Sequence, residues 1–406
     1  MELKKYKLGE IAYFVEDKIS SNEISLNEYI TTDCLLQNKK GRTIATNLPP
    51  QSCSLTKFQK EDILIGNIRP YLKKIWFADI DGGCSLDVLV LRSRNKNEST
   101  YLFSILMQDS FFDFVMKATK GSKMPRGDKN HILNFLCFDI SNKIKIGNFI
   151  KSLDDKIALN RRINAELEAM AKELYDYYFV QFDFPNADGK PYKSSGGKMV
   201  YSDVLKREIP EGWEVKKLGE ILELLKDGTH NPPKRVENGI ALLTGTMFGD
   251  NFLDFSKATY ITEEDYKSIH SQYAPQEGDV IITKIGTLGN VNYLSKFDIP
   301  IAIHCNSALL RFPKTFGLFG FYYCKSDLFK MRLRAVKGQS IQEFVSLNRI
   351  ESIFMEIPPK EIISAFNEKA QPIFDYQLSL EQETQQLTAL RDELLPLLMN
   401  GQVEVR

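Results

Sequence analysis

The sequence predicts an α/β protein with two similar domains that are separated by two long helices. Three observations lead to this prediction. The tetrapeptide Lys7–Glu10 returns as Lys217–Glu220, further matches follow in the same order, and each half closes with a long heptad-patterned segment. A period this long indicates a duplicated domain, because the repeats of a solenoid span only roughly 20 to 50 residues.

The repeat continues through strands and helices. Each half contains an acidic turn that leads into an apolar strand, a second strand that ends on arginine, and a basic glycine turn after an aromatic-rich helix. The matched segments are Lys60–Ile68 with Gln276–Ile285, Cys84–Arg92 with Cys305–Arg311, and Ala118–Ser122 with Ala335–Ser340.

The first domain is expected at residues 1–144, where short apolar runs predict strands and an aromatic-rich run predicts a helix. The strands are Ile63–Ile68, Lys74–Ala78 and Val88–Arg92, and the helix is Tyr101–Lys117. A first domain of this kind belongs to the mixed α/β class.

Four further segments follow the first domain. A central spacer helix is expected at residues 145–182, a connector at 183–199, the second domain at 200–358 and a C-terminal spacer helix at 359–406. The connector is rich in Gly, Ser and Pro, which cannot continue a helix. Pro358 and Pro359 end the second domain, and Asn400 with Gly401 is typical of a helix C-cap.

The two long helices are expected to pack on each other. Seam positions in the first alternate steps of three and four, and those in the second repeat every seven residues, as in a coiled coil. These positions are Ile150, Leu153, Ile157, Asn160, Asn164, Leu167 and Leu174, and Ile373, Leu380, Leu387 and Leu394. Such a stripe usually packs on its own domain, but both helices are longer than a compact domain needs. We therefore expect an antiparallel pair, roughly 45 Å long, with a pseudo-two-fold axis between the domains and the asparagines fixing its register.

Composition places the chain among ordinary globular proteins. Its 406 residues are 43% hydrophobic and 26% charged. No apolar stretch approaches the roughly 20 residues that a bilayer crossing requires, and the N-terminus lacks an apolar signal core, so we expect a cytoplasmic protein without membrane contact. The six cysteines form no CxxC pair and the four histidines show no ligand spacing, which argues against disulfides and a metal site.

Charge is balanced overall but clustered locally. The 53 basic and 53 acidic residues cancel, which argues against an independent, strongly basic nucleic-acid binder. Basic residues nevertheless gather at the corresponding place in each half, around Lys117–Lys129 and Lys325–Lys337. A solvated surface explains either cluster alone, whereas their recurrence favours a phosphate-facing stripe on a neutral body.

Several segments resemble a known family. The run Ile157–Glu168, with its continuation Leu174–Pro185, closely resembles the central conserved region of the specificity subunit of type I restriction-modification systems. Ile209–Trp213 and Asp227–His230 resemble the start of that family's second target-recognition domain, and Asp279–Asn290 is similar to its glycine-bearing strand and loop. The resemblance covers essentially the whole chain.

The resemblance implies a non-catalytic subunit that reads double-stranded DNA. In that family each target-recognition domain reads one half of a bipartite site, and the paired helices set the gap between the halves. Two modification subunits would bind this scaffold and methylate adenine with S-adenosylmethionine, and restriction subunits would add an ATP- and Mg-dependent nuclease. The chain itself is expected to hold no cofactor.

Candidate DNA-binding residues lie on polar turns, where side-chain and backbone donors could meet phosphates or base edges. For each one, ordinary surface turn chemistry is the alternative. They are Asn67, Arg69, Tyr71, Lys120, Ser122, Lys123 and Arg126 in the first half, and Thr229, His230, Lys234, Arg235, Lys284, Thr287, Arg334, Lys337, Gln339 and Ser340 in the second.

No motif supports catalysis. The run 231–233 is similar to the Asn-Pro-Pro-aromatic motif of amino-methyltransferases, but Lys234 stands in the aromatic position. Neither a cofactor-binding Gly-x-Gly loop nor a P-loop occurs, and Asp62 and Asp279 are better explained as caps of the turn before a strand. Two alternatives stay open: a specificity subunit of a related system whose single partner chain both methylates and cleaves, or a coiled-coil adaptor that never touches DNA.

Overall fold

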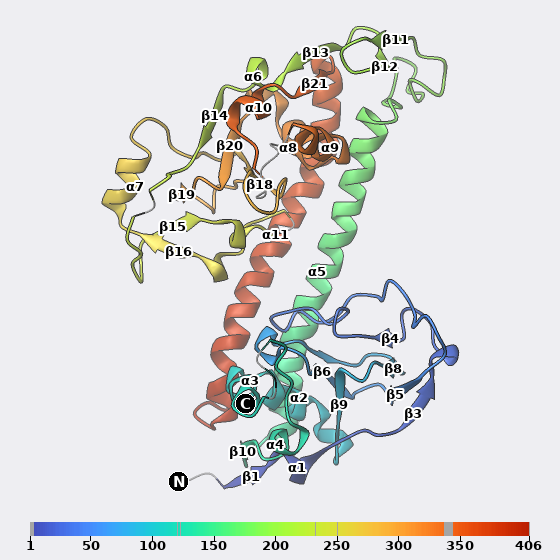
Figure 1. The fold of residues 1–406 in the computed structure, drawn as a ribbon, viewed down its shortest axis with the longest axis vertical. Coiled ribbons are helices and arrows are strands. Elements are labelled where there is room, and N and C mark those ends of the chain that lie inside the picture. Colours follow the sequence, from blue (N-terminus) through green and yellow to red (C-terminus); the bar gives the residue numbers. More distant parts are fainter. Residues whose placement is uncertain are drawn as a thin grey trace. The chain divides into compact units, whose positions relative to one another are not determined.

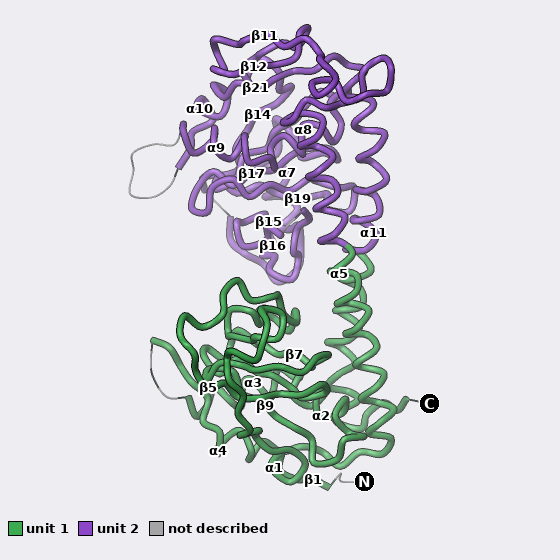
Figure 2. The backbone as a smooth tube through the Cα atoms, turned by 90° about the vertical axis from the view of Figure 1, so that its right-hand side faces the viewer, with its two compact units in different colours: residues 1–163, 382–406 green, residues 164–381 purple. Residues whose placement is uncertain are grey.

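A computed structural model of the protein describes residues 4–119, 121, 123–231, 233–249, 251–336 and 344–405. The chain divides into two compact units, shown in different colours in Figure 2. Unit 1 comprises residues 1–163 and 382–406, and unit 2 comprises residues 164–381. Both long helices therefore contribute one part to each unit.

Unit 1 contains two four-stranded sheets and a separate two-stranded ladder (Figure 1). The first sheet has the order β2 (Ala12–Phe14), β9 (Val88–Ser93), β6 (Ile63–Gly66) and β7 (Ile75–Phe77). The second has the order β3 (Lys18–Ser20), β5 (Ser54–Phe58), β8 (Gly82–Cys84) and β4 (Tyr29–Ile30), and the ladder pairs β1 (Lys5–Lys7) with β10 (Leu136–Phe138). The helices are α1 (Leu8–Ile11), α2 (Ser99–Met107), α3 (Asp109–Met116) and α4 (Lys129–Ile132), with 3₁₀ turns η1 (Ser21–Glu23), η2 (Pro70–Leu72) and η3 (Lys96–Glu98).

Strand β6 is buried on both faces, because a hydrophobic core covers each of them. Successive side chains of a strand point to opposite sides, so they enter the two cores in turn. Ile63 and Ile65 enter a core that includes residues of α2 and α3, whereas Leu64 packs into a second core with residues of the second sheet. The first sheet thus lies between a helical layer and the second sheet, which explains why β6 reads as an unbroken apolar run.

Two helices replace the single helix expected at Tyr101–Lys117. Gln108 has extended backbone angles, φ −65° and ψ 142°, which end α2 and make Asp109 the first residue of α3. Polar Gln108, Asp109 and Ser110 interrupt the apolar run at this point. The break places a carboxylate at the N-terminal end of α3, where the helix dipole favours a negative charge.

Unit 2 repeats this arrangement with a smaller second sheet. Its first sheet has the order β14 (Leu224–Asp227), β20 (Ser307–Arg311), β17 (Val280–Thr283) and β18 (Val291–Tyr293), and its second has the order β16 (Thr259–Ile261), β15 (Ile240–Leu243) and β19 (Ile301–Ile303). Two ladders pair β13 (Glu214–Lys217) with β21 (Phe354–Ile357), and β11 (Met199–Ser202) with β12 (Arg207–Pro210). The helices are α6 (Leu218–Ile221), α7 (Glu263–Ile269), α8 (Leu318–Lys325), α9 (Asp327–Ala335) and α10 (Leu347–Glu351), with 3₁₀ turns η4 (Gly245–Met247), η5 (Phe255–Lys257) and η6 (Lys314–Phe316).

The segment expected as a connector belongs to the core of unit 2. Phe184 stacks on Tyr192 at 4.7 Å and on Trp213 at 5.7 Å between ring centroids. Phe182 meets Trp213 edge-on at 5.2 Å. These aromatic contacts fold residues 183–199 onto the domain that follows them, so the segment is not a free linker.

The long helices α5 (Lys143–Phe179) and α11 (Lys360–Met399) pack on each other in antiparallel fashion within each unit. In unit 1, Asp154 pairs with Arg391 at 2.9 Å, and Asn160 donates to Glu383 at 2.7 Å. Residue numbers therefore increase along α5 in the direction in which they decrease along α11. In unit 2, Gln377 donates to the Asn164 carbonyl at 3.3 Å, which continues that order.

The buried column of α11 differs from the leucine repeat seen in the sequence. Leu380 is buried, but Ile373, Leu387 and Leu394 are only half-buried and flank the seam. On α5, Ile150, Ile157 and Asn160 are buried, and Leu153, Asn164, Leu167 and Leu174 are half-buried. The column of α11 that is buried at every seventh position consists of Ile363, Ala370, Gln377, Thr384, Arg391 and Leu398. Three of these six side chains are polar, so an apolar pattern could not reveal the column.

Candidate nucleic-acid interface

A buried aspartate–arginine pair supports the same strand in each unit. Asp62, which precedes β6, is 1% exposed, and its carboxylate accepts two hydrogen bonds of 2.7 Å from Arg92. Asp279, which precedes β17, accepts two of 2.8 Å from Arg311. Each carboxylate also accepts the backbone N–H three residues before it. Both aspartates therefore cap the turn before a strand, as the sequence indicates, and bidentate pairs of this kind are strong.

Loop A, residues 67–74, connects β6 to β7 and brings several candidate residues of unit 1 together. The Asn67 N–H donates to the Asp87 carbonyl at 2.9 Å, and Ile68 forms an antiparallel bridge with Arg126. The Arg126 guanidinium pairs with the Asp87 carboxylate at 2.9 Å. Asn67 and Arg126 thus lie in one cluster although they are far apart in the sequence.

Arg69, Tyr71 and Lys123 are exposed beside this cluster. Arg69 has a left-handed backbone, φ 53°, and its N–H donates to the Pro125 carbonyl at 2.8 Å. The Tyr71 side chain is 50% exposed. Cationic and aromatic side chains on one exposed surface are suited to phosphate and base contacts.

Loop B, residues 284–290, begins in the same way in unit 2. The Lys284 N–H donates to the Asn306 carbonyl at 2.8 Å, and Ile285 bridges Phe344. Lys284 thus takes the place that Asn67 has in loop A. Its side chain differs from the exposed contact that the sequence suggests: it is 3% exposed, and its ammonium lies 3.1 Å from the Asp227 carboxylate and over the Phe344 ring.

The Asp227–His230 motif joins loop B through a shared carboxylate. His230 Nε2 lies 3.2 Å from the Asp227 oxygen that Lys284 contacts. Thr229 forms a parallel bridge to His304 next to β19. A Cβ on Gly228 would lie 1.8 Å from the Ile303 carbonyl oxygen, so the bend requires glycine. The bend leaves His230 largely exposed.

Lys234 and Arg235 follow on the same exposed segment. Burial lowers the pKa of His304, and the charges of His230 and Arg235 lower it further. The charge of Arg235 thus acts on His304, the residue that Thr229 bridges.

Thr287 is exposed on loop B, and Arg334 is exposed on α9. A Cβ on Gly289 would lie 3.3 Å from Leu333, so loop B packs against α9 at the residue that precedes Arg334. The remaining candidates, Lys120, Ser122, Lys337, Gln339 and Ser340, lie outside the described residues.

Sequence reasoning missed the residues that precede the strands β9 and β20. Asp87 and Asn306 each accept the first N–H of the neighbouring hairpin loop. Leu86, beside Asp87, is 74% exposed. A signal for them exists in the sequence, because each is a polar residue directly before one of two matched strands.

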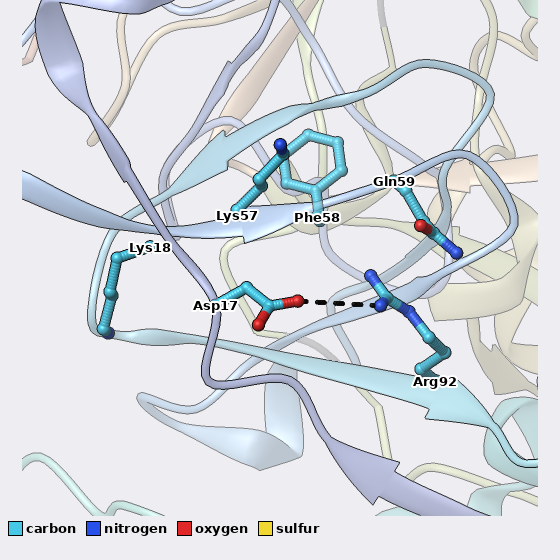
Figure 3. Close-up of a pocket in the computed structure, with 6 residues that line it drawn as sticks. All are labelled: Asp17, Lys18, Lys57, Phe58, Gln59 and Arg92. Atoms are coloured by element: carbon cyan, nitrogen blue, oxygen red, sulfur yellow. Dashed lines mark ion pairs between the residues drawn. The ribbon is translucent and has the colours of Figure 1, made fainter.

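A polar pocket of about 340 Å³ lies at the other end of β6 and β9 (Figure 3). Lys18, Lys57 and Gln59 line it together with Asp17 and Arg92, which are 3.8 Å apart. The Arg92 guanidinium is already bound to Asp62. Because Asn67 follows β6 and Arg92 lies near the end of β9, this pocket is separate from loop A.

The described part of the chain lacks two features. Within these residues, no group of three or more His, Cys, Asp or Glu side chains is arranged to hold a metal ion. Among the helices formed by the same residues, none combines the length and apolarity needed to cross a membrane.

Comparison with known proteins identifies relatives along the whole chain. Residues 210–394 match the family described as type I restriction modification DNA specificity domain. The chain is 24% identical to the type I restriction enzyme MjaIX specificity subunit of Methanocaldococcus jannaschii, over 100% of this chain and 89% of that protein. It is 26% identical to the HindI specificity subunit of Haemophilus influenzae, over 98% and 99%.

A solved structure shows the same fold. The S subunit of a type I restriction-modification system from M. genitalium aligns with a TM-score of 0.60 over 100% of this chain and 97% of that one, at 14% identity. Relatives and fold agree with the twin α/β units and the antiparallel helices described above. Residues 210–394 thus match a type I restriction modification DNA specificity domain, and over its whole length the chain is similar to type I specificity subunits.

Proposed function

We propose that the chain is the sequence-reading subunit of a DNA-modifying complex, in which each unit reads one half of a bipartite site. One observation supports this proposal. Loops A and B follow corresponding strands, and the first N–H of each donates to the residue before the neighbouring strand; we call these matched strands and bonds the frame. The two loops nevertheless present different exposed side chains. Loop A offers Arg69 and Tyr71, and loop B offers Thr287 beside the His230 segment. Equal frames with unequal loops suit two readers of different half-sites.

In this proposal the helix pair sets the gap between the half-sites and binds two modification subunits. A groove of about 700 Å³ on the helix pair of unit 2 supports a docking role. Its lining includes Met170, Tyr177 and Ile373, and the Met170 side chain is 54% exposed. In unit 1, Leu159 and Leu390 are exposed on the same two helices. Apolar side chains of this kind are typical of interface cores.

The modification subunits would supply S-adenosylmethionine-dependent adenine methylation, and restriction subunits would supply the ATP- and Mg-dependent step. This chain would contribute sequence choice, with no cofactor of its own. The difference between the exposed loops supports this role over an adaptor for identical partners, because such an adaptor has no use for two different loops on corresponding strands.

The test is a single-molecule methylation map of host DNA with and without the gene. We expect deletion to abolish one bipartite, asymmetric adenine motif. Arg69→Ala should weaken methylation through one half of that motif, and a double change of Lys234→Ala with Arg235→Ala through the other. Lys57→Ala, on β5 in the polar pocket away from loop A, is the matched control and should leave the map unchanged.

An unchanged map after deletion, with the partner methyltransferase expressed, would contradict the proposal and favour the adaptor. With the purified complex, the salt dependence of binding gives a second readout. Each lost phosphate contact should reduce the slope of log affinity against log salt by about one unit. Arg334→Ala is expected to show such a reduction.

A further inference from the structure

Loop A is held from outside by a turn far away in the sequence. The Asn38 N–H donates to the Leu72 carbonyl and the Lys39 N–H donates to the Lys73 carbonyl, both at 2.9 Å. Asn38 and Lys39 have left-handed backbones, φ 56° and 60°, as does Lys73 at the end of the loop, φ 50°. Such conformations are costly for residues other than glycine and persist only where their surroundings hold them.

The side chain of Lys39 adds a buried clamp. It is 7% exposed, and its ammonium lies 2.8 Å from Asp109 Oδ1, while Lys73 Nζ lies 3.0 Å from Asp109 Oδ2. Burial alone would raise the pKa of Asp109, but hydrogen bonds from Lys39 and Lys73 outweigh it and hold this pKa below its usual range. One carboxylate at the start of α3 thus binds the supporting turn and the end of loop A together.

The clamp continues to the helix pair. Lys39 Nζ lies 3.9 Å from Asp392 Oδ1 on α11. The same Asp392 oxygen accepts from Arg391, whose guanidinium pairs with Asp154 on α5 at 2.9 Å. Arg391 is 2% exposed, so it is fixed between the two helices. Charges of alternating sign thus run from α5 through α11 and Lys39 to the end of loop A, all within unit 1.

We propose that Lys39 is a positioning residue for sequence reading by unit 1. It fixes loop A against α3 and α11, so that Arg69 and Tyr71 face the DNA in one geometry. Without its ammonium, Asp109 no longer joins the supporting turn to Lys73, and the end of the loop at this left-handed residue samples several conformations. Base discrimination falls because hydrogen bonds to base edges depend on position. This inference rests on the proposed function.

The test compares Lys39→Met, Lys39→Arg and Lys57→Met in the full chain, in complex with its methyltransferase partner. Lys39→Met keeps length but removes charge, Lys39→Arg keeps the charge, and Lys57 is an exposed lysine of the same unit. The readout is the ratio of binding to the mapped motif over binding to DNA with one altered base, measured separately for each half-site.

Lys39→Met is expected to lower this ratio about tenfold at one half-site, which must be the half-site that Arg69→Ala affects. The other half-site should be unchanged, and Lys39→Arg and Lys57→Met should behave as the natural protein. An unchanged ratio at both halves, or an equal fall at both, overturns the inference. A natural complex that discriminates at neither half overturns the proposed function instead. If Lys39→Met does not fold, Asp109→Asn is judged by the same two outcomes.

Discussion

Loops A and B occupy the same place in the same frame, yet they are stabilised in different ways. Loop A has left-handed residues that are not glycine, and backbone bonds from Asn38 and Lys39 hold it from outside. Loop B places glycines at its left-handed positions, Gly286 with φ 81° and Gly289 with φ 79°, and closes on itself. A loop can therefore change its sequence and its support while the frame beneath it stays the same.

The hydroxyl group of Thr283 adds two hydrogen bonds to the closure of loop B, beside the backbone bonds from the Thr283 N–H to the Asn290 carbonyl and from the Gly289 N–H to the Thr283 carbonyl. Thr283, the last residue of β17, accepts from the Asn290 N–H at 3.0 Å and donates to the Thr287 carbonyl. Gly66 takes the corresponding position at the end of β6 and has no side chain to play this role. Local turn chemistry thus does in unit 2 what distant charged contacts do in unit 1.

The largest expected effect tests the shared frame. Asp62→Ala and Asp279→Ala should each destabilise their own unit by about 3–5 kcal/mol, because each removes the buried carboxylate that binds a partly buried arginine through two hydrogen bonds. Hydrogen exchange of the β6 and β17 amides reports each unit separately. Asp17→Ala is the control, since Asp17 is exposed and 3.8 Å from Arg92, and it should cost under about 0.5 kcal/mol. A loss below about 1 kcal/mol for either buried aspartate would show that the pairs do not support the frame.

A smaller effect separates the two loops. Thr283→Val should destabilise loop B by about 1–3 kcal/mol, because the Asn290 N–H and the Thr287 carbonyl lose their partner. Thr283→Ser keeps the hydroxyl and should stay close to the natural protein. The measurement is hydrogen exchange of loop B amides, with loop A amides unaffected. Equal exchange in Thr283→Val and Thr283→Ser would mean that the hydroxyl group does not stabilise the loop.

The frame was accessible from the sequence because its signals are local. Apolar runs that follow an acidic turn predict buried strands, and a strand that ends on arginine occurs in both halves. Asp62 and Arg92 hence recur as Asp279 and Arg311. Heptad patterning likewise predicted a pair of long helices, and their connection through the second domain predicted that they are antiparallel; the fold agrees on both points.

The surroundings of single charged residues were not accessible. Lys284 and Lys39 look like ordinary surface lysines in the sequence, yet both are buried against carboxylates that are distant along the chain. The burial of the polar residues in the α11 column, such as Gln377 and Arg391, could not be predicted for the same reason. A polar residue in a heptad is expected to be exposed unless its partner is known. Partnership of this kind is set by tertiary packing, which sequence spacing does not encode.

Low pH should destabilise unit 2 more than unit 1, because three of the four histidines lie in unit 2. Burial lowers the pKa of His270, only partly offset by its hydrogen bond to Tyr273, and burial also lowers that of His304. His270 Nε2 accepts from the Ile303 N–H at 3.3 Å, which protonation would abolish. A depressed folded pKa gives stability that is present above the ordinary value near 6.5 and is lost as pH falls through the folded value.

Unit 2 should therefore lose stability between pH 7.5 and 5.5 relative to unit 1, by at most about 1.4 kcal/mol per pH unit for each histidine. Hydrogen exchange at several pH values, corrected for intrinsic rates, measures this difference. His270→Gln removes one titrating group and should flatten the response of unit 2. A parallel loss in both units would remove the histidines as its cause.

The smallest effect concerns the first residues of α3 and α9. Asp109 binds two lysines, one of them buried, whereas Asp327 pairs only at the surface with Lys172 of α5, at 3.0 Å. A hydrogen bond and the charge of Lys172 lower the pKa of Asp327, but 78% of this side chain is exposed and water screens the pair. Ser326 also caps α9 without help from Asp327, since its hydroxyl accepts from the Phe329 N–H at 3.1 Å.

Asp327→Asn should therefore cost only a few tenths of a kcal/mol in unit 2. Asp109→Asn should cost about 1 kcal/mol in unit 1, because it weakens the only short ion pair that the described residues give to the buried Lys39 ammonium. Water screens part of this loss, since 58% of the Asp109 side chain is exposed. Urea unfolding followed by exchange of the α3 and α9 amides compares the two variants directly. Equal losses would mean that the helix dipole, which acts alike on both aspartates, outweighs the lysine clamp. A larger loss for Asp109→Asn would show that support from outside the loop is what distinguishes unit 1 from unit 2.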